Sequence, residues 1–286
     1  MANVNVSTGK LLTRYENNQS TSRERVDWLH WTITKLHHVF KNSIVIITFL
    51  ALWEAAPRLG LVNETFFPPI TEVAKAWWGL LLSGDFVDHT VTSLTRSIGG
   101  FTLAILVSIP LGLAIGWWKT AAEYLNPLLE VFRNTAALAI LPVFILLLGL
   151  GETSKIAIVF YACVFPLLLN TISGVRNVDP LLIKSARSMG LSPISLFRKV
   201  IIPASVPTIF VGIRQAGASS ILVLVAAEMV GAKSGLGYLI QYTQFSFQIT
   251  EMYAGIISIS VIGLIINYLL VQLEKRLTSW KQVYSE

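Results

Sequence analysis

The chain has 286 residues, of which 53% are hydrophobic and only 13% are charged, with a mean hydropathy of +0.64. Soluble domains carry about 25% charged residues, so this composition excludes an ordinary soluble protein and indicates an integral membrane protein. The net charge of +6 does not call for nucleic acid as a partner, because basic loops on the inner side of a membrane produce the same excess. Cys163 is the single cysteine, which excludes an internal disulfide and a cysteine metal cluster.

The first 42 residues are polar and are predicted to form a cytoplasmic tail. Residues 26–40 within it are weakly amphipathic, which favours a helix lying on the membrane surface. His30, His37 and His38 lie in this stretch. They are interpreted as polar residues of a solvated interfacial helix, with a metal site as the alternative.

Six apolar runs follow, and together they predict an all-α membrane domain over residues 43–275. A bilayer core of about 30 Å needs about 20 helical residues. The six spans are predicted at 43–56, 97–118, between 133 and 152, 156–175, 209–230 and 252–273. Pro142 is expected to break the third span. Residues 57–94 are expected to hold one or two surface helices, and residues 231–250 a re-entrant stretch.

Lysine and arginine are unevenly divided between the two sides of these six spans. With the amino terminus inside, basic residues favour the inner side by about three to one. We therefore expect both termini, including a short tail over residues 276–286, in the cytoplasm.

The stretch over residues 178–203 is a polar, basic island between two apolar runs, and it is predicted to lie in the cytoplasm. Asp179 is expected to cap a first short helix, with Pro180 at its first position. Gly190 is expected to end that helix in a left-handed conformation. A second start signal follows at residues 192–193, and Pro203 is expected to mark a break.

Side chains of the first short helix divide between two faces. Leu182, Ala186 and Met189 share one face by their spacing, and Lys184 and Arg187 leave on another. This pattern is typical of a helix that presents itself to something outside the bilayer.

Catalytic signatures are missing from the chain. The run over residues 231–234 has no phosphate-loop frame, and Gly149-Leu150-Gly151 lacks the third glycine of a dinucleotide fingerprint.

A membrane-embedded enzyme acting on lipid or prenyl substrates would need clustered acids or histidines. A gradient-driven carrier usually keeps ionisable groups within its spans, where only Arg214 and Glu228 qualify. The sequence therefore favours a transporter whose energy is supplied by another subunit. A membrane-embedded enzyme and a gradient-driven carrier are the alternatives.

The island resembles the EAA loop of permease subunits of bacterial ABC importers. Ala186, Gly190 and Pro203 match that pattern with its spacing, while Lys184 stands where the family has glutamate and Ser185 where it has the first alanine. Four other stretches resemble the nitrate, sulfonate, taurine and bicarbonate branch, with the sulfonate and taurine permeases closer. They are SLTRSIGGF (93–101), GLGETSK (149–155), AAEMVGA (226–232) and GLGYLI (235–240).

The resemblance implies a type I importer fold and a set of partners. Two ATPase subunits would bind ATP and magnesium, so this chain would need no cofactor of its own. A second permease subunit, identical to this one, would complete the pore in a bacterial inner membrane, and a periplasmic or lipid-anchored binding protein would deliver a small anion. The residues implied in coupling to the ATPase are Leu182, Lys184, Ala186, Arg187, Met189, Gly190 and Pro203.

Four residues of the fifth span are candidates for the translocation path. Arg214 could line the exit of an anion or snorkel to the headgroups. Glu228 would repel an anion, so we interpret it as a hydrogen-bonding or gate residue, with a solvated helix end as the alternative. Ser219 and Ser220 belong to a run of small residues, 216–220, that suits either the dimer axis or the pore.

Overall fold

The computed structural model describes residues 44–278, and the predictions for the tail over residues 1–42, with its surface helix and histidines, lie outside the described residues. The same holds for residues 279–286 of the carboxyl-terminal tail. Within residues 44–278 the chain is helical, without a β-strand. It divides into two compact units, Met1–Thr71 and Glu72–Glu286, and each is described by itself.

The first unit contains a helix over residues 44–58, where the first span was predicted. Its described part is about 22 Å long at 1.5 Å per residue, short of a bilayer core. The chain then folds back on the end of this helix. Trp53 Nε1 donates to the carbonyl of Pro68 at 3.1 Å, and the amide and hydroxyl of Thr71 donate to Glu54.

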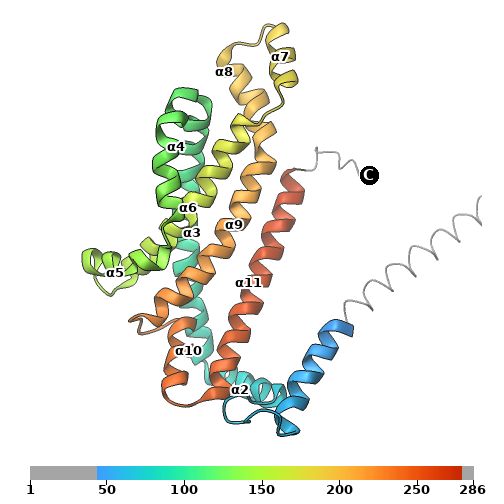
Figure 1. The fold of residues 1–286 in the computed structure, drawn as a ribbon, viewed down its shortest axis with the longest axis vertical. Coiled ribbons are helices and arrows are strands. Elements are labelled where there is room, and N and C mark those ends of the chain that lie inside the picture. The colour runs from blue at the N-terminus through green and yellow to red at the C-terminus, as the bar shows by residue number, and fades with distance from the viewer. Residues whose placement is uncertain (1–43, 279–286) are drawn as a thin grey trace, which may run out of the picture. The chain divides into compact units, whose positions relative to one another are not determined.

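Helices of the second unit are shown in Figure 1, and four helical stretches among the described residues are long and apolar enough to cross a membrane. They are α3 (Asp85–Trp117), α6 (Glu152–Arg176), the continuous path over Pro193–Met229, and α11 (Ile249–Leu277). The short helix α2 (Ile70–Ser83) precedes them. The region of surface helices, expected over residues 57–94, therefore ends at residue 84, because α3 begins twelve residues before the predicted span.

The third predicted span is broken, but the expected break at Pro142 is wrong. Instead α4 (Lys119–Asn134) and α5 (Ala137–Leu148) form a pair bent by 90°, which counts as a fifth crossing if the two are taken together. Pro142 lies inside α5, and the break is at Thr135 and Ala136. The side chains of Asn134 and Thr135 bond carbonyls one turn back, at 2.8 and 3.0 Å. These bonds satisfy the last carbonyls of α4 and so allow it to end there.

Helix α6 lies between α3 and α9 (Ile202–Met229) in Figure 1 and packs closely on both. Small residues at every fourth position of α3 make this approach possible. They are Gly100, Ala104, Ser108, Gly112 and Gly116, all buried. A Cβ on Gly112 would lie 2.7 Å from the Cβ of Thr171 on α6. Backbones of α3 and α6 therefore meet as they do in helix pairs of the small-xxx-small type.

The expected break at Pro203 is also wrong. The helix α8 (Pro193–Leu196) continues through a π-helical turn, η1 (Phe197–Ile201), into α9. In that turn the amide of Ile202 donates to the carbonyl of Phe197, five residues back. Pro203 has no N–H, and its ring would clash with the carbonyl four residues earlier in a regular α-helix. The wider π turn relieves this conflict without ending the helix.

The stretch expected to be re-entrant, residues 231–250, contains one short helix. This helix, α10 (Leu236–Phe245), packs against α9 and α11.

Candidate functional site

The short helix predicted in the island is present as α7 (Pro180–Ser188), and its ends match the sequence signals. The carboxylate of Asp179 accepts from the amide of Leu181 at 2.7 Å, and Pro180 occupies the first turn. Gly190 has a φ of +77°. The amide of Leu191 bonds the carbonyl of Ala186 and the amide of Gly190 bonds that of Arg187, which together form a Schellman motif.

One face of α7 is anchored to the rest of the protein. Ala186 is 2% exposed and packs with Val178, Leu196 and Ile201. The ring centroids of Trp117, at the end of α3, and Phe197 lie 4.9 Å apart beside this cluster. The small side chain of Ala186, one of the residues implied in coupling, thus allows close packing within the chain.

Most of the remaining surface of α7 is exposed. Leu182 and Met189 are 50% and 72% exposed, although their spacing places them on the same side of the helix as the buried Ala186. Lys184 and Arg187 are exposed too, and Pro203 lies half-buried in α9. A Cβ on Gly190 would meet nothing within 4 Å. The result is a firmly seated helix that presents two apolar side chains and two cations to its surroundings.

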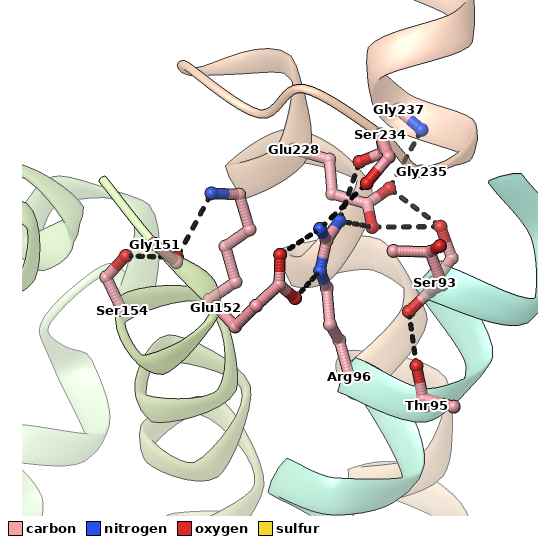
Figure 2. A network of polar contacts seen from close by, with 12 residues as sticks. Ser93, Thr95, Arg96, Gly151, Glu152, Ser154, Glu228, Ser234, Gly235 and Gly237 are labelled. Carbon is pink, nitrogen blue, oxygen red and sulfur yellow. Dashed lines mark hydrogen bonds and ion pairs between the residues drawn. The ribbon is translucent and has the colours of Figure 1, made fainter. Parts of the chain in front are cut away.

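A network of charged and polar groups lies at the other end of the bundle, shown in Figure 2. The guanidinium of Arg96 lies between the carboxylates of Glu152 and Glu228, and its Nη1 is 2.7 Å from Glu228 Oε1. Nη1 also donates to the carbonyl of Ser234 at 2.7 Å. The network joins α3, α6, α9 and the loop before α10, and Arg96 and Glu152 had no role assigned from the sequence.

Glu228 accepts several bonds in this network and is fully buried. Its Oε2 lies 2.8 Å from Ser93 Oγ and 2.9 Å from the amide of Gly237. A Cβ on Gly235 would lie 2.3 Å from Glu228 Oε1, so the loop can pass this carboxylate only with glycine there. These contacts fit the hydrogen-bonding interpretation of Glu228 rather than a solvated helix end or a path-lining side chain.

A cavity with a volume of about 720 Å³ lies beside the middle of α6. Its walls come from the bend between α4 and α5, from α6 and from α9. Among the described lining residues Arg133 is the one charged side chain, and the polar ones are Thr135, Tyr161, Asn170, Ser173, Gln215 and Ser219. A second cavity of about 450 Å³ shares Arg133, Leu169 and Ser173 with the first and extends to Arg176.

The four predicted path residues lie in different places. Ser219 lines the 720 Å³ cavity. Ser220 is buried, with its hydroxyl 3.1 Å from that of Ser97. Arg214 lines a separate cavity between α9 and α11 and pairs with Glu274 at 3.3 Å. The sequence analysis missed Asn170, Gln215 and Arg133. Polar side chains inside apolar runs were the available signal, since such residues are rare in spans and mark pathways.

Comparisons with known proteins identify relatives over most of the chain. Residues 89–279 match the family described as "Binding-protein-dependent transport system inner membrane component". A probable ABC transporter permease of Brucella abortus is 37% identical over 78% of this chain and 90% of its own. The putative aliphatic sulfonates transport permease SsuC of Bacillus subtilis is 33% identical, over 85% and 88% of the two chains. The taurine transport system permease TauC of Escherichia coli is 30% identical, over 92% and 96%.

The fold of this chain is also similar to that of solved ABC transporter structures. A structure of the MetNI methionine ABC transporter in inward-facing conformations matches with a TM-score of 0.59. It covers 69% of this chain and 98% of that chain at 17% sequence identity. The fold is therefore that of type I ABC importer permeases.

Proposed function

Because the chain belongs to the family of binding-protein-dependent transport system inner membrane components, we propose that it is the permease subunit of an ATP-driven importer for a small organic sulfonate. Two copies of the chain would form the path, two ATPase subunits would bind ATP and magnesium, and a binding protein would deliver the substrate. Nitrate and bicarbonate are the competing anions.

The exposed side chains of α7 are the observation that supports an importer driven by ATPase subunits. The sequence carries no nucleotide-binding signature, so in this proposal the energy of ATP arrives through a contact with another subunit. Leu182 and Met189 are exposed apolar side chains on a helix fixed at both ends. A helix of this kind docks in a groove of its partner by its apolar anchors. Lys184 and Arg187 beside them would meet acidic groups on the ATPase.

The choice of a sulfonate is supported by the relatives and by the charge of the cavity. Two relatives are named as permeases for aliphatic sulfonates and for taurine, and both kinds of compound carry a sulfonate group. The 720 Å³ cavity has Arg133 as its charged side chain among the described lining residues. A positive charge without a lining acid favours an anion over a cation.

Orientation in the membrane follows from the same proposal. The end of the bundle that carries α7 would face the cytoplasm, and the end that carries the Arg96 network would face outward. A reporter fused after Gly190 should score as cytoplasmic and one after Gly235 as external. Both reporters on one side of the membrane would contradict this orientation.

Docking through α7 is tested with two substitutions that place the same charge on the same helix. Met189→Glu should abolish co-purification of the ATPase subunit and substrate-stimulated ATP hydrolysis in liposomes, because a charge would enter an apolar contact. Ser188→Glu, at a neighbouring exposed and already polar position, is the matched control and should retain both. Full co-purification of the Met189→Glu chain would remove α7 as the docking element.

Transport itself is tested with the assembled importer in liposomes. Taurine and ethanesulfonate should accumulate inside only when ATP is hydrolysed, with nitrate and bicarbonate as competitors. Accumulation without ATP would indicate a gradient-driven carrier instead, and accumulation of nitrate alone would change the substrate class.

A further inference from the structure

We propose that the 720 Å³ cavity contains a binding site for the sulfonate group of the substrate, in which N–H groups of Gln215 and Arg133 face the anion and Asn170 orients Gln215. This inference rests on the proposed function and names the residues that would select the anion within the membrane. It replaces Arg214, which lines a different cavity, with residues that the sequence patterns did not single out.

The orientation of the Gln215 amide follows from its hydrogen bonds. Asn170 Nδ2 lies 2.8 Å from the carbonyl of Pro166, which can only accept, so this atom of Asn170 is the amide nitrogen. Its other proton goes to Gln215 Oε1 at 3.0 Å. The carbonyl of Gln215 is thereby occupied, and its NH₂ group has no hydrogen-bond partner among the described residues. Gln215 thus has both N–H donors of its amide available to the cavity.

A close contact between α6 and α9 makes this pair possible. A Cβ on Gly212 would lie 2.8 Å from the Cβ of Asn170 and 3.0 Å from the carbonyl of Pro166. Glycine at this position lets α9 approach α6 where Pro166 and Asn170 lie. Gln215 and Ser219 follow Gly212 by three and seven residues, so they occupy the same face of α9. Both line the cavity.

Arg133 supplies the charge of the site. It ends α4 at the 90° bend and contacts Glu130 at 3.3 Å, with both side chains about half exposed. An exposed pair of this kind contributes little, and a guanidinium has five N–H donors, so Arg133 retains donors for a ligand. The second cavity shares Arg133, reaches Arg176 and is also lined by Glu130. Its two cations against one acid leave a net positive charge on the way to the end that carries α7.

Size and polarity of the cavity also fit a small sulfonate. Ligand cavities usually have volumes of about 300–1,000 Å³ and combine apolar walls with a few polar groups. Here Phe132, Phe165 and Leu169 supply apolar wall beside the donors. An organic sulfonate has the matching form, with three acceptor oxygens on a short carbon chain.

The charge of the site is measured with a cysteine at Ser219 in the assembled importer. The Ser219→Cys thiol is modified by an anionic methanethiosulfonate reagent that carries a sulfonate, and separately by a cationic trimethylammonium reagent. The native Cys163 is fully buried, so the unsubstituted chain serves as the blank. We expect Arg133→Gln to lower the ratio of anionic to cationic modification rates by about tenfold, the low end for a charged cleft.

Matched variants separate this site from a general effect of positive charge. Arg133→Lys should keep most of the ratio, because it keeps the charge. Arg214→Gln removes a cation from the same helix that carries Ser219, but from another cavity, and should leave the ratio unchanged. The proposal is overturned if Arg133→Gln leaves the ratio unchanged, if Arg214→Gln lowers it equally, or if neither reagent reaches the thiol.

Binding is measured by protection of the same thiol. Methanesulfonate should slow its modification by the cationic reagent, whereas uncharged dimethyl sulfone at the same concentration should not. Gln215→Leu and Asn170→Leu should each weaken the protection several-fold, the second by releasing the Gln215 amide. Equal protection in these variants, or none in the chain with native Gln215 and Asn170, would overturn the site. If the native importer accumulates no sulfonate while the rate ratio still depends on Arg133, the proposed substrate fails and the anion-attracting cavity stands.

Discussion

Arg96 and Glu228 form an ion pair in the interior of the helix bundle, with Nη1 2.7 Å from Oε1 and with 2% and 0% of their side chains exposed. They lie 132 residues apart in the chain. The remaining bonds of the pair go to Glu152, Ser93 and the loop over residues 234–237. The pair therefore joins three spans and the loop that leads into α10.

Removing Arg96 should destabilise the protein more than removing both partners. Arg96→Met leaves the buried Glu228 charged and without a cation, at a cost of about 3–5 kcal/mol. The double variant Arg96→Met/Glu228→Met leaves no buried charge there and should lose less. Thermal unfolding of the purified chains in detergent measures both. A double variant that melts below Arg96→Met would show that the charges are not the main contribution.

A methyl group on Gly235 should be poorly tolerated. Its Cβ would lie 2.3 Å from Glu228 Oε1, and its φ of +117° is strained for any other residue. We expect Gly235→Ala to lower the melting temperature clearly. The matched control is Gly79→Ala, in α2, where a Cβ meets nothing within 4 Å. That exchange should be neutral or stabilise by about 0.5–1 kcal/mol, because alanine favours a helix interior over glycine. Equal effects of the two exchanges would contradict this account.

Substitutions of Gly190 separate backbone strain from docking. Its φ of +77° costs an ordinary side chain about 1–2 kcal/mol, whereas asparagine visits this conformation more readily. The surrounding space within the chain is open. We therefore expect Gly190→Asn to keep transport, and Gly190→Asp to lose it by placing an acid against the ATPase. Co-purification of the ATPase and stimulated hydrolysis in liposomes are the measurements. Full stimulation in Gly190→Asp would count against coupling through this turn.

The pair Arg214–Glu274 predicts the result of exchanging its charges. The two side chains lie 3.3 Å apart and are 37% and 21% exposed, so solvent screens the pair and its contribution is about 0.2–1 kcal/mol. If Arg214 serves only to join α9 to α11, Arg214→Glu should lower uptake and the added Glu274→Arg should restore it. If Arg214 attracts the anion instead, the exchanged pair stays as inactive as the single variant. Uptake by the importer in liposomes decides between the two.

Local signals in the sequence were sufficient for the class of protein and for the ends of α7. The length and apolarity of a run decide whether it can cross a bilayer, and both are properties of the run alone. Asp179 and Gly190 act through bonds to atoms within five residues of themselves. Their effects could therefore be predicted without knowing what the helix packs against. The family resemblance of the same stretch rested on equally local spacing.

Only the tertiary structure decided where side chains from distant segments meet. The four family-like stretches contain Ser93, Glu152, Glu228 and Gly235, and nothing in their spacing indicated that they converge on the Arg96–Glu228 ion pair. Ala186 is buried while Leu182 and Met189 on the same side of α7 are exposed, because helical periodicity groups residues but does not say which of them are buried. The Asn170–Gln215 pair depends on how closely α6 and α9 approach, and that distance is set by packing at Gly212. Contacts of this kind depend on the relative placement of helices, which no local pattern records.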